Sequence, residues 1–86
     1  EFITVTDEEI MAAIATMARR TGVFPEPAGA APFAGLVKLA AAGRLSGTSA
    51  AVMVTGNGLK DIATARRVAG KAIEIAPSLA AVKEHL

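Results

Sequence analysis

The residues Thr55, Gly56, Asn57 and Gly58 place a hydroxyl, an amide and two glycines at the end of an apolar run. Glycine lets the backbone approach a ligand closely, and a helix starting just beyond would add free backbone N–H groups. Thr55 would stand at the C-terminal end of a buried parallel strand, where α/β folds bind ligands. The same pattern is typical of a plain tight turn with a turn-capping threonine, so both interpretations stay open.

Two charged residues, Glu26 and Lys60, are candidates for a binding site. Glu26 stands between Pro25 and Pro27, which mount its carboxylate rigidly ahead of a predicted helix. It could line a site, although an acid at this place more often favours the helix dipole. Lys60 could meet a phosphate, but a lysine beside Asp61 is usually one half of a solvated surface pair. No catalytic triad, metal cluster or pair of catalytic carboxylates can be assembled with any specificity.

Capping residues and apolar spacing predict four helices. Thr6 and Glu9 form a capping box ahead of the first helix, and Arg19 and Arg20 suit its last turn before Gly22. Pro32 is compatible with the second helix only in its first turn. The predicted ranges are about 7 to 21, about 29 to 42, 62 to 69 behind an Asp61 N-cap, and 77 or 78 to the end.

Three short segments read as strands, namely FITV, AAVMVT and KAIEIAP. The resulting order, β-α-α-β-α-(β)-α, predicts an α/β fold with parallel strands. Two or three strands make a poor sheet, and a parallel sheet needs both of its faces covered. We therefore expect part of a three-layer parallel sheet within an incomplete domain.

The composition narrows the class of protein. The chain has 86 residues, enough for one small domain. Its 52% of hydrophobic residues suggest an apolar surface that packs against a partner. A net charge of +1 and three Phe without Trp or Tyr argue against nucleic-acid binding. The apolar runs are too short to cross a bilayer and the first residues lack a signal-peptide layout, so we expect a cytoplasmic protein without a membrane partner. The absence of Cys and a single histidine, His85, argue against disulfides and transition-metal sites.

Three segments carry a resemblance to a known family: VTDEEI, GVFPEPAGAAPFAGLVKL and VMVTGNGLKD. In this order and spacing they resemble the C-terminal part of the threonine synthase family, over roughly residues 5 to 61. That family belongs to the fold-type-II, tryptophan-synthase-β-like enzymes, which use pyridoxal 5′-phosphate. The segment TGNGLKD discriminates best, because the related dehydratases tend to carry a Ser-Gly-Gly-Asn or similar turn there. EPAGA is shared across the superfamily.

The resemblance implies a function for the residues singled out above. Thr55 would hydrogen-bond the pyridine nitrogen of the cofactor, Gly56 and Asn57 would shape the pocket floor, and residues 26 to 29, beginning with Glu26, would form a neighbouring wall. The implied reaction converts O-phospho-L-homoserine and water into L-threonine and phosphate. The implied partners are a phosphorylated amino acid, the remainder of the enzyme and a second copy in a homo-oligomer.

The chain also departs from the family pattern. The family holds its cofactor as a Schiff base on a lysine in the N-terminal half and binds the phosphate in an upstream glycine-rich loop. Lys38, Lys60, Lys71 and Lys83 do not stand in that motif, and the chain has no run of consecutive glycines. We therefore expect residues 1 to 86 to be a C-terminal fragment that has no catalytic residue of its own and is inactive alone. The alternatives are a non-catalytic dimerising interaction module and a fragment of a serine or threonine dehydratase, which TGNGLKD disfavours.

Overall fold

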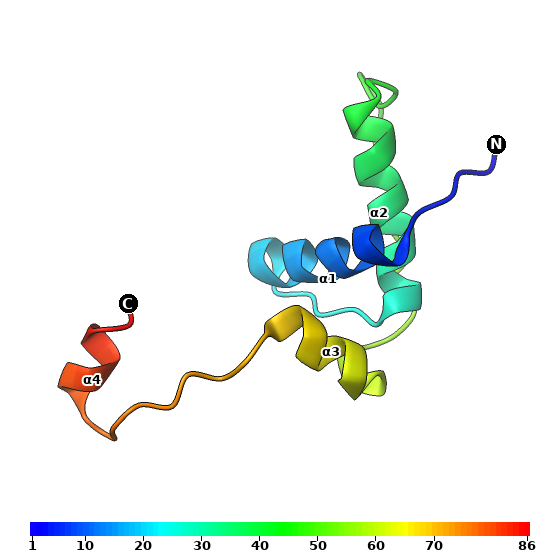
Figure 1. The fold of residues 1–86 in the computed structure, drawn as a ribbon. Helices are drawn as coiled ribbons and strands as arrows, with labels where there is room; N and C mark the ends of the chain where they lie inside the picture. The colour runs from blue at the N-terminus through cyan, green and yellow to red at the C-terminus, as the bar shows by residue number, and fades with distance from the viewer.

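The computed structural model describes all 86 residues as helices joined by irregular segments (Figure 1). A three-residue 3-10 helix, η1, lies just ahead of the third α-helix. No helix is both long enough and apolar enough to cross a bilayer. The elements are α1 (Asp7–Thr21), α2 (Pro27–Ala41), η1 (Gly58–Lys60), α3 (Ile62–Ala69) and α4 (Leu79–Lys83).

Helix α1 begins and ends where its capping residues predict. The Thr6 hydroxyl accepts a hydrogen bond from the Glu9 backbone N–H at 3.1 Å, and the Glu9 carboxylate accepts one from the Thr6 N–H at 2.7 Å. Gly22 ends the helix with φ 74°, a conformation that suits glycine. The predicted capping box and stop are therefore confirmed.

Helix α2 begins earlier than the sequence predicts. Pro27, not Gly29, opens it, because the fixed φ of proline suits the first position of a helix and no N–H is lost there. Pro32 consequently lies inside the helix, beyond its first turn. The expectation that Pro32 would stand in the first turn is wrong, and the helix lacks one backbone hydrogen bond at this proline.

Helices α1 and α2 cross and form the centre of the molecule (Figure 1). Their contact is built on small side chains, which let the two backbones approach closely. The buried cluster consists of Ala13, Ile14, Ala30 and Ala34, and Val68 of α3 packs against it. This core is small for a chain of 86 residues, since nine residues in all are buried.

The predicted parallel sheet is wrong: the structure contains no β-strand and therefore no α/β layer. Its single β-bridge is isolated and antiparallel, between Pro25 and Asn57. Residues 2 to 5, 50 to 55 and 71 to 76 carry strand-like patterns but are not strands in the structure. A strand needs a neighbour for its backbone N–H and C=O groups, and no two of these segments lie side by side as a ladder. The order β-α-α-β-α-(β)-α is thus replaced by four helices.

The C-terminal part extends away from the helical centre. The segment after Gly70 leads to α4, which stands apart from the other three helices (Figure 1). The molecule is accordingly elongated, with extents of 53 × 27 × 18 Å. A terminal helix is present as predicted, but it is shorter: Ser78 is its N-cap, and it runs from Leu79 to Lys83 instead of from residue 77 or 78 to the end.

Candidate functional site

The predicted turn at residues 55 to 58 is held against the loop that leads into α2. The Glu26 N–H donates to the Gly56 carbonyl at 2.9 Å, and the Gly58 N–H donates to the Phe24 carbonyl at 2.9 Å. These two bonds flank the bridge between Pro25 and Asn57. The structure therefore brings Glu26, Gly56 and Asn57 together, although about 30 residues separate them in the sequence.

Both glycines of the turn are covered by side chains of the facing loop. A Cβ at Gly56 would overlap the Glu26 carboxylate, lying 2.5 Å from its Cδ. A Cβ at Gly58 would lie 2.5 Å from Cζ of the Phe24 ring. Real side chains do not approach so closely, so a larger residue at Gly56 would require the Glu26 carboxylate to move, and one at Gly58 would require the Phe24 ring to move.

Thr55 is exposed, and its backbone packs against Gly29 in the first turn of α2. Its backbone nitrogen would stand 3.3 Å from a Cβ built at Gly29, so the small residue in EPAGA leaves room for this approach. The Thr55 hydroxyl makes no hydrogen bond within the chain, whereas the Thr48 and Thr64 hydroxyls each make one. A free hydroxyl can donate one hydrogen bond and accept others from a ligand.

Glu26 occupies the N-cap position of α2, but its side chain makes no capping hydrogen bond. The carboxylate instead turns toward Gly56 and lies 3.3 Å from the Lys60 ammonium nitrogen. Its side chain is 17% exposed, against 64% for Lys60. The carboxylate thus stands at the N-terminus of a helix and also borders the predicted site.

Asn57 and Asp61 shape the chain after the turn. The Asn57 side-chain oxygen accepts a hydrogen bond from the Leu59 N–H at 2.8 Å and caps η1. The Asp61 carboxylate accepts from the Thr64 N–H at 3.0 Å and from the Thr64 hydroxyl at 2.7 Å, which confirms its predicted role as N-cap of α3. Both hydrogen bonds lower the pKa of Asp61, and the one from the Thr64 backbone N–H has the larger effect.

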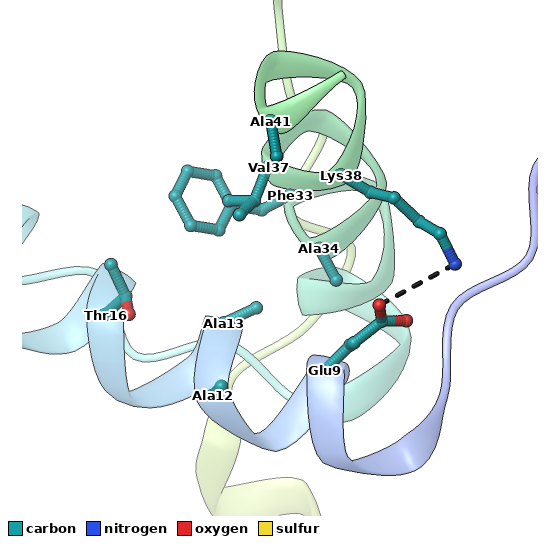
Figure 2. Close-up of a pocket in the computed structure, with 9 residues that line it drawn as sticks. All are labelled: Glu9, Ala12, Ala13, Thr16, Phe33, Ala34, Val37, Lys38 and Ala41. Atoms are coloured by element: carbon teal, nitrogen blue, oxygen red, sulfur yellow. Dashed lines mark ion pairs between the residues drawn. The ribbon is translucent and has the colours of Figure 1, made fainter.

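The largest hollow of the molecule lies elsewhere, between α1 and α2. It is a groove of about 300 Å³ with Phe33 and Val37 on one side and Ala12 and Ala13 on the other (Figure 2). Lys38 and Glu9 close one end, with 3.6 Å between the Lys38 nitrogen and a Glu9 carboxylate oxygen. No residue of the turn lines this groove, and Thr55 and Asn57 are exposed, so the predicted site is open to solvent.

Sequence reasoning missed the contact between Lys60 and Glu26. It paired Lys60 with the adjacent Asp61. In the structure, Asp61 instead accepts a hydrogen bond from Thr64, and Lys60 contacts Glu26, 34 positions upstream. No local signal could reveal this pair, because it depends on how the loop and the turn meet. No cluster of acidic or histidine side chains could hold a metal ion.

Known proteins are similar to this chain over most of its length. The family model described as "Pyridoxal-phosphate dependent enzyme" matches residues 1–56. Threonine synthase of Mycobacterium leprae is 43% identical over 86 residues, which are 99% of this chain and 24% of that protein. Threonine synthase of Halalkalibacterium halodurans is 52% identical over 62 residues, 71% of this chain and 18% of that protein. Threonine synthase of Methanocaldococcus jannaschii is 41% identical over 83 residues, which are 95% of this chain and 20% of that protein. The chain therefore spans a quarter or less of the length of these relatives.

Proposed function

Because this chain belongs to the pyridoxal-phosphate dependent enzyme family, we propose that it forms one wall of the cofactor pocket in a longer enzyme. The observation that carries the proposal is the Thr55 hydroxyl, which is exposed and makes no hydrogen bond within the chain. The turn that bears it is held by two backbone hydrogen bonds to the loop ahead of α2. The Thr55 hydroxyl is therefore free to donate a hydrogen bond to an acceptor atom on the planar cofactor ring.

The residues around Thr55 fit a cofactor edge of this kind. A hydroxyl can donate a hydrogen bond to a pyridine nitrogen, but as a neutral group of very low acidity it leaves that nitrogen unprotonated. Gly56 and Asn57 would form the floor beneath the ring, and Glu26 the neighbouring wall. When bound, pyridoxal phosphate supplies the electron sink for removing a proton next to an amino group. The part of this chain is to bind and orient the nitrogen side of the ring.

The complete reaction that we propose is that of threonine synthase, in which O-phospho-L-homoserine and water give L-threonine and phosphate. The relatives support it over a dehydratase, since those that cover 71% to 99% of this chain are threonine synthases. The chain contributes the C-terminal part of the enzyme and is not catalytic alone. Its partners are the remainder of the enzyme, the phosphorylated amino-acid substrate and a second copy.

A dimerising interaction module is the second candidate, because a dimer interface would also use exposed apolar side chains. Met53, Leu59 and Ile73 are 78%, 67% and 69% exposed. Such a surface is typical of an interaction site, which could belong either to the rest of an enzyme or to a second copy. Sedimentation of the isolated chain distinguishes the two: a stable dimer with a cooperative unfolding transition favours the module.

The test of the proposed function is Thr55→Ala in the full-length enzyme. Losing one hydrogen bond to the cofactor should weaken cofactor binding by about tenfold, in line with about 1.4 kcal/mol. It should also shift the absorbance maximum of the bound cofactor, because the ring nitrogen loses its partner. Both are measured by spectroscopic titration of the cofactor-free enzyme.

Two further variants make this test specific. Thr55→Ser keeps the hydroxyl and should keep both the affinity and the absorbance maximum. Thr48→Ala removes another exposed hydroxyl, one that bonds only the Leu45 carbonyl at 2.8 Å, and should change neither. Unchanged affinity, spectrum and turnover in Thr55→Ala would refute the assignment.

A further inference from the structure

We propose that Lys60 is a positioning residue, whose ammonium group holds the Glu26 carboxylate over Gly56 and so fixes the turn that presents Thr55. The proposal rests on the proposed function for the purpose of the turn. The contact itself belongs to this chain and is independent of any ligand. It joins η1, the turn and the N-terminus of α2 at one point.

The Glu26 carboxylate depends on Lys60 for its only partner. Its side chain is 17% exposed, it makes no capping bond to α2, and its one hydrogen bond within the chain comes from the Lys60 nitrogen at 3.3 Å. A carboxylate that is largely removed from water is unfavourable unless a charge or a donor compensates it. Without Lys60, the carboxylate is expected to rotate toward solvent.

The position of this ion pair explains why it would hold the turn. The carboxylate occupies the space that a side chain at Gly56 would fill, and the Lys60 nitrogen lies 3.1 Å from the same point. Directly beside it, the Gly56 carbonyl accepts the Glu26 N–H, and the Gly58 N–H donates to Phe24. The ion pair therefore lies against Gly56, beside the hydrogen bond between the Glu26 N–H and the Gly56 carbonyl.

An ordinary surface ion pair would have little effect, because two exposed charges gain little in water. Here the two partners are exposed to very different degrees, 17% for Glu26 and 64% for Lys60. By contrast, both partners of the Lys38 and Glu9 pair are about equally open, at 49% and 40%. Losing Lys60 would leave the enclosed Glu26 carboxylate without a partner, and its movement toward solvent would loosen the turn.

The experiment uses the full-length enzyme without cofactor and the variants Lys60→Met and Lys60→Arg. Hydrogen exchange is measured at the Glu26 and Gly58 amides, and cofactor affinity by titration with pyridoxal phosphate. Lys60→Met should speed exchange and weaken binding by about threefold to tenfold, the range for one hydrogen bond involving a charged group in a partly open setting. Lys60→Arg keeps the charge and should stay within about twofold of the parent enzyme.

Three more variants separate the ion pair from a general loss of charge. Lys71→Met removes a lysine that makes no ion pair and should leave exchange and affinity unchanged. Glu26→Gln removes the enclosed charge itself and should therefore have a smaller effect than Lys60→Met, and the double variant should be no worse than Lys60→Met alone. Lys60→Gln replaces Lys60→Met if the apolar side chain impairs folding.

Unchanged exchange and affinity in Lys60→Met would overturn the proposal, as would a double variant whose effect is the full sum of the single ones. The exchange measurement does not involve the cofactor, so its result is independent of the proposed function. Faster exchange in Lys60→Met together with unaltered binding in Thr55→Ala would retain the positioning role and refute the cofactor assignment. Unchanged exchange in Lys60→Met together with weakened binding in Thr55→Ala would refute the positioning role alone.

Discussion

At the scale of single residues, Gly58 packs directly against the Phe24 ring. A Cβ there would lie 2.5, 2.6 and 2.7 Å from three carbons of the Phe24 ring. We predict that Gly58→Ala lowers the free energy of unfolding of the full-length enzyme by about 1 to 3 kcal/mol, the usual cost of overpacking. Urea-induced unfolding measures the change. The smaller side chain in Phe24→Leu should recover part of the loss in the double variant, and equal stability of Gly58→Ala and the parent would contradict the prediction.

The residues of the site differ in how well the sequence predicts them. Local chemistry is enough for the Asp61 cap, because the acceptor and the N–H that it binds are three positions apart. Thr55 and Gly56 stand out for the same local reason, as small and polar residues after an apolar run, and their ligand remains a prediction. The Glu26 and Lys60 pair could not be predicted from residue type, since 34 positions separate its members.

At the scale of elements, the N-terminus of α3 should respond to pH. Hydrogen bonds from Thr64 lower the pKa of Asp61, so the folded state keeps this carboxylate ionised to lower pH than the unfolded chain does. Its contribution to stability is therefore complete above the ordinary pKa of about 4 and is lost as the pH falls through the lowered value.

The matched variant for this cap is Asp61→Asn, which keeps an N-cap acceptor but does not titrate. We predict that the free energy of unfolding of the parent enzyme falls relative to that of Asp61→Asn below about pH 4, with a constant difference above about pH 5. Denaturant unfolding at a series of pH values provides the comparison. Two parallel curves over the whole range would show that the cap contributes no pH dependence.

The helices could be predicted from the sequence and the sheet could not, for one physical reason. A helix satisfies its backbone within a few residues, so its limits can be predicted from nearby residues such as Thr6, Glu9 and Gly22. The predicted limits differ from the structure by two residues at the start of α2, and α4 ends at Lys83, before the end of the chain. A strand needs a partner elsewhere, and the patterns at 2 to 5, 50 to 55 and 71 to 76 find none in this chain.

At the scale of the whole molecule, the apolar composition and the small core require a common explanation. The chain is 52% hydrophobic, yet nine of its residues are buried, and Phe2, Met53 and Leu79 are 104%, 78% and 70% exposed. A chain of this size is marginally stable even when it packs well. The relatives are at least four times as long as the part that matches, which agrees with a surface that packs against more polypeptide.

We therefore predict that the isolated 86-residue chain binds the dye ANS strongly and unfolds over a broad temperature range, whereas the full-length enzyme does neither. Dye binding reports exposed apolar surface, and a broad transition reports the lack of a cooperative core. Fluorescence titration and circular dichroism measured on both proteins provide the comparison. A sharp transition of the isolated chain without dye binding would mean that its exposed apolar residues find partners within the chain or in a second copy. In that case the dimerising module would replace the enzyme fragment as the better account of this surface.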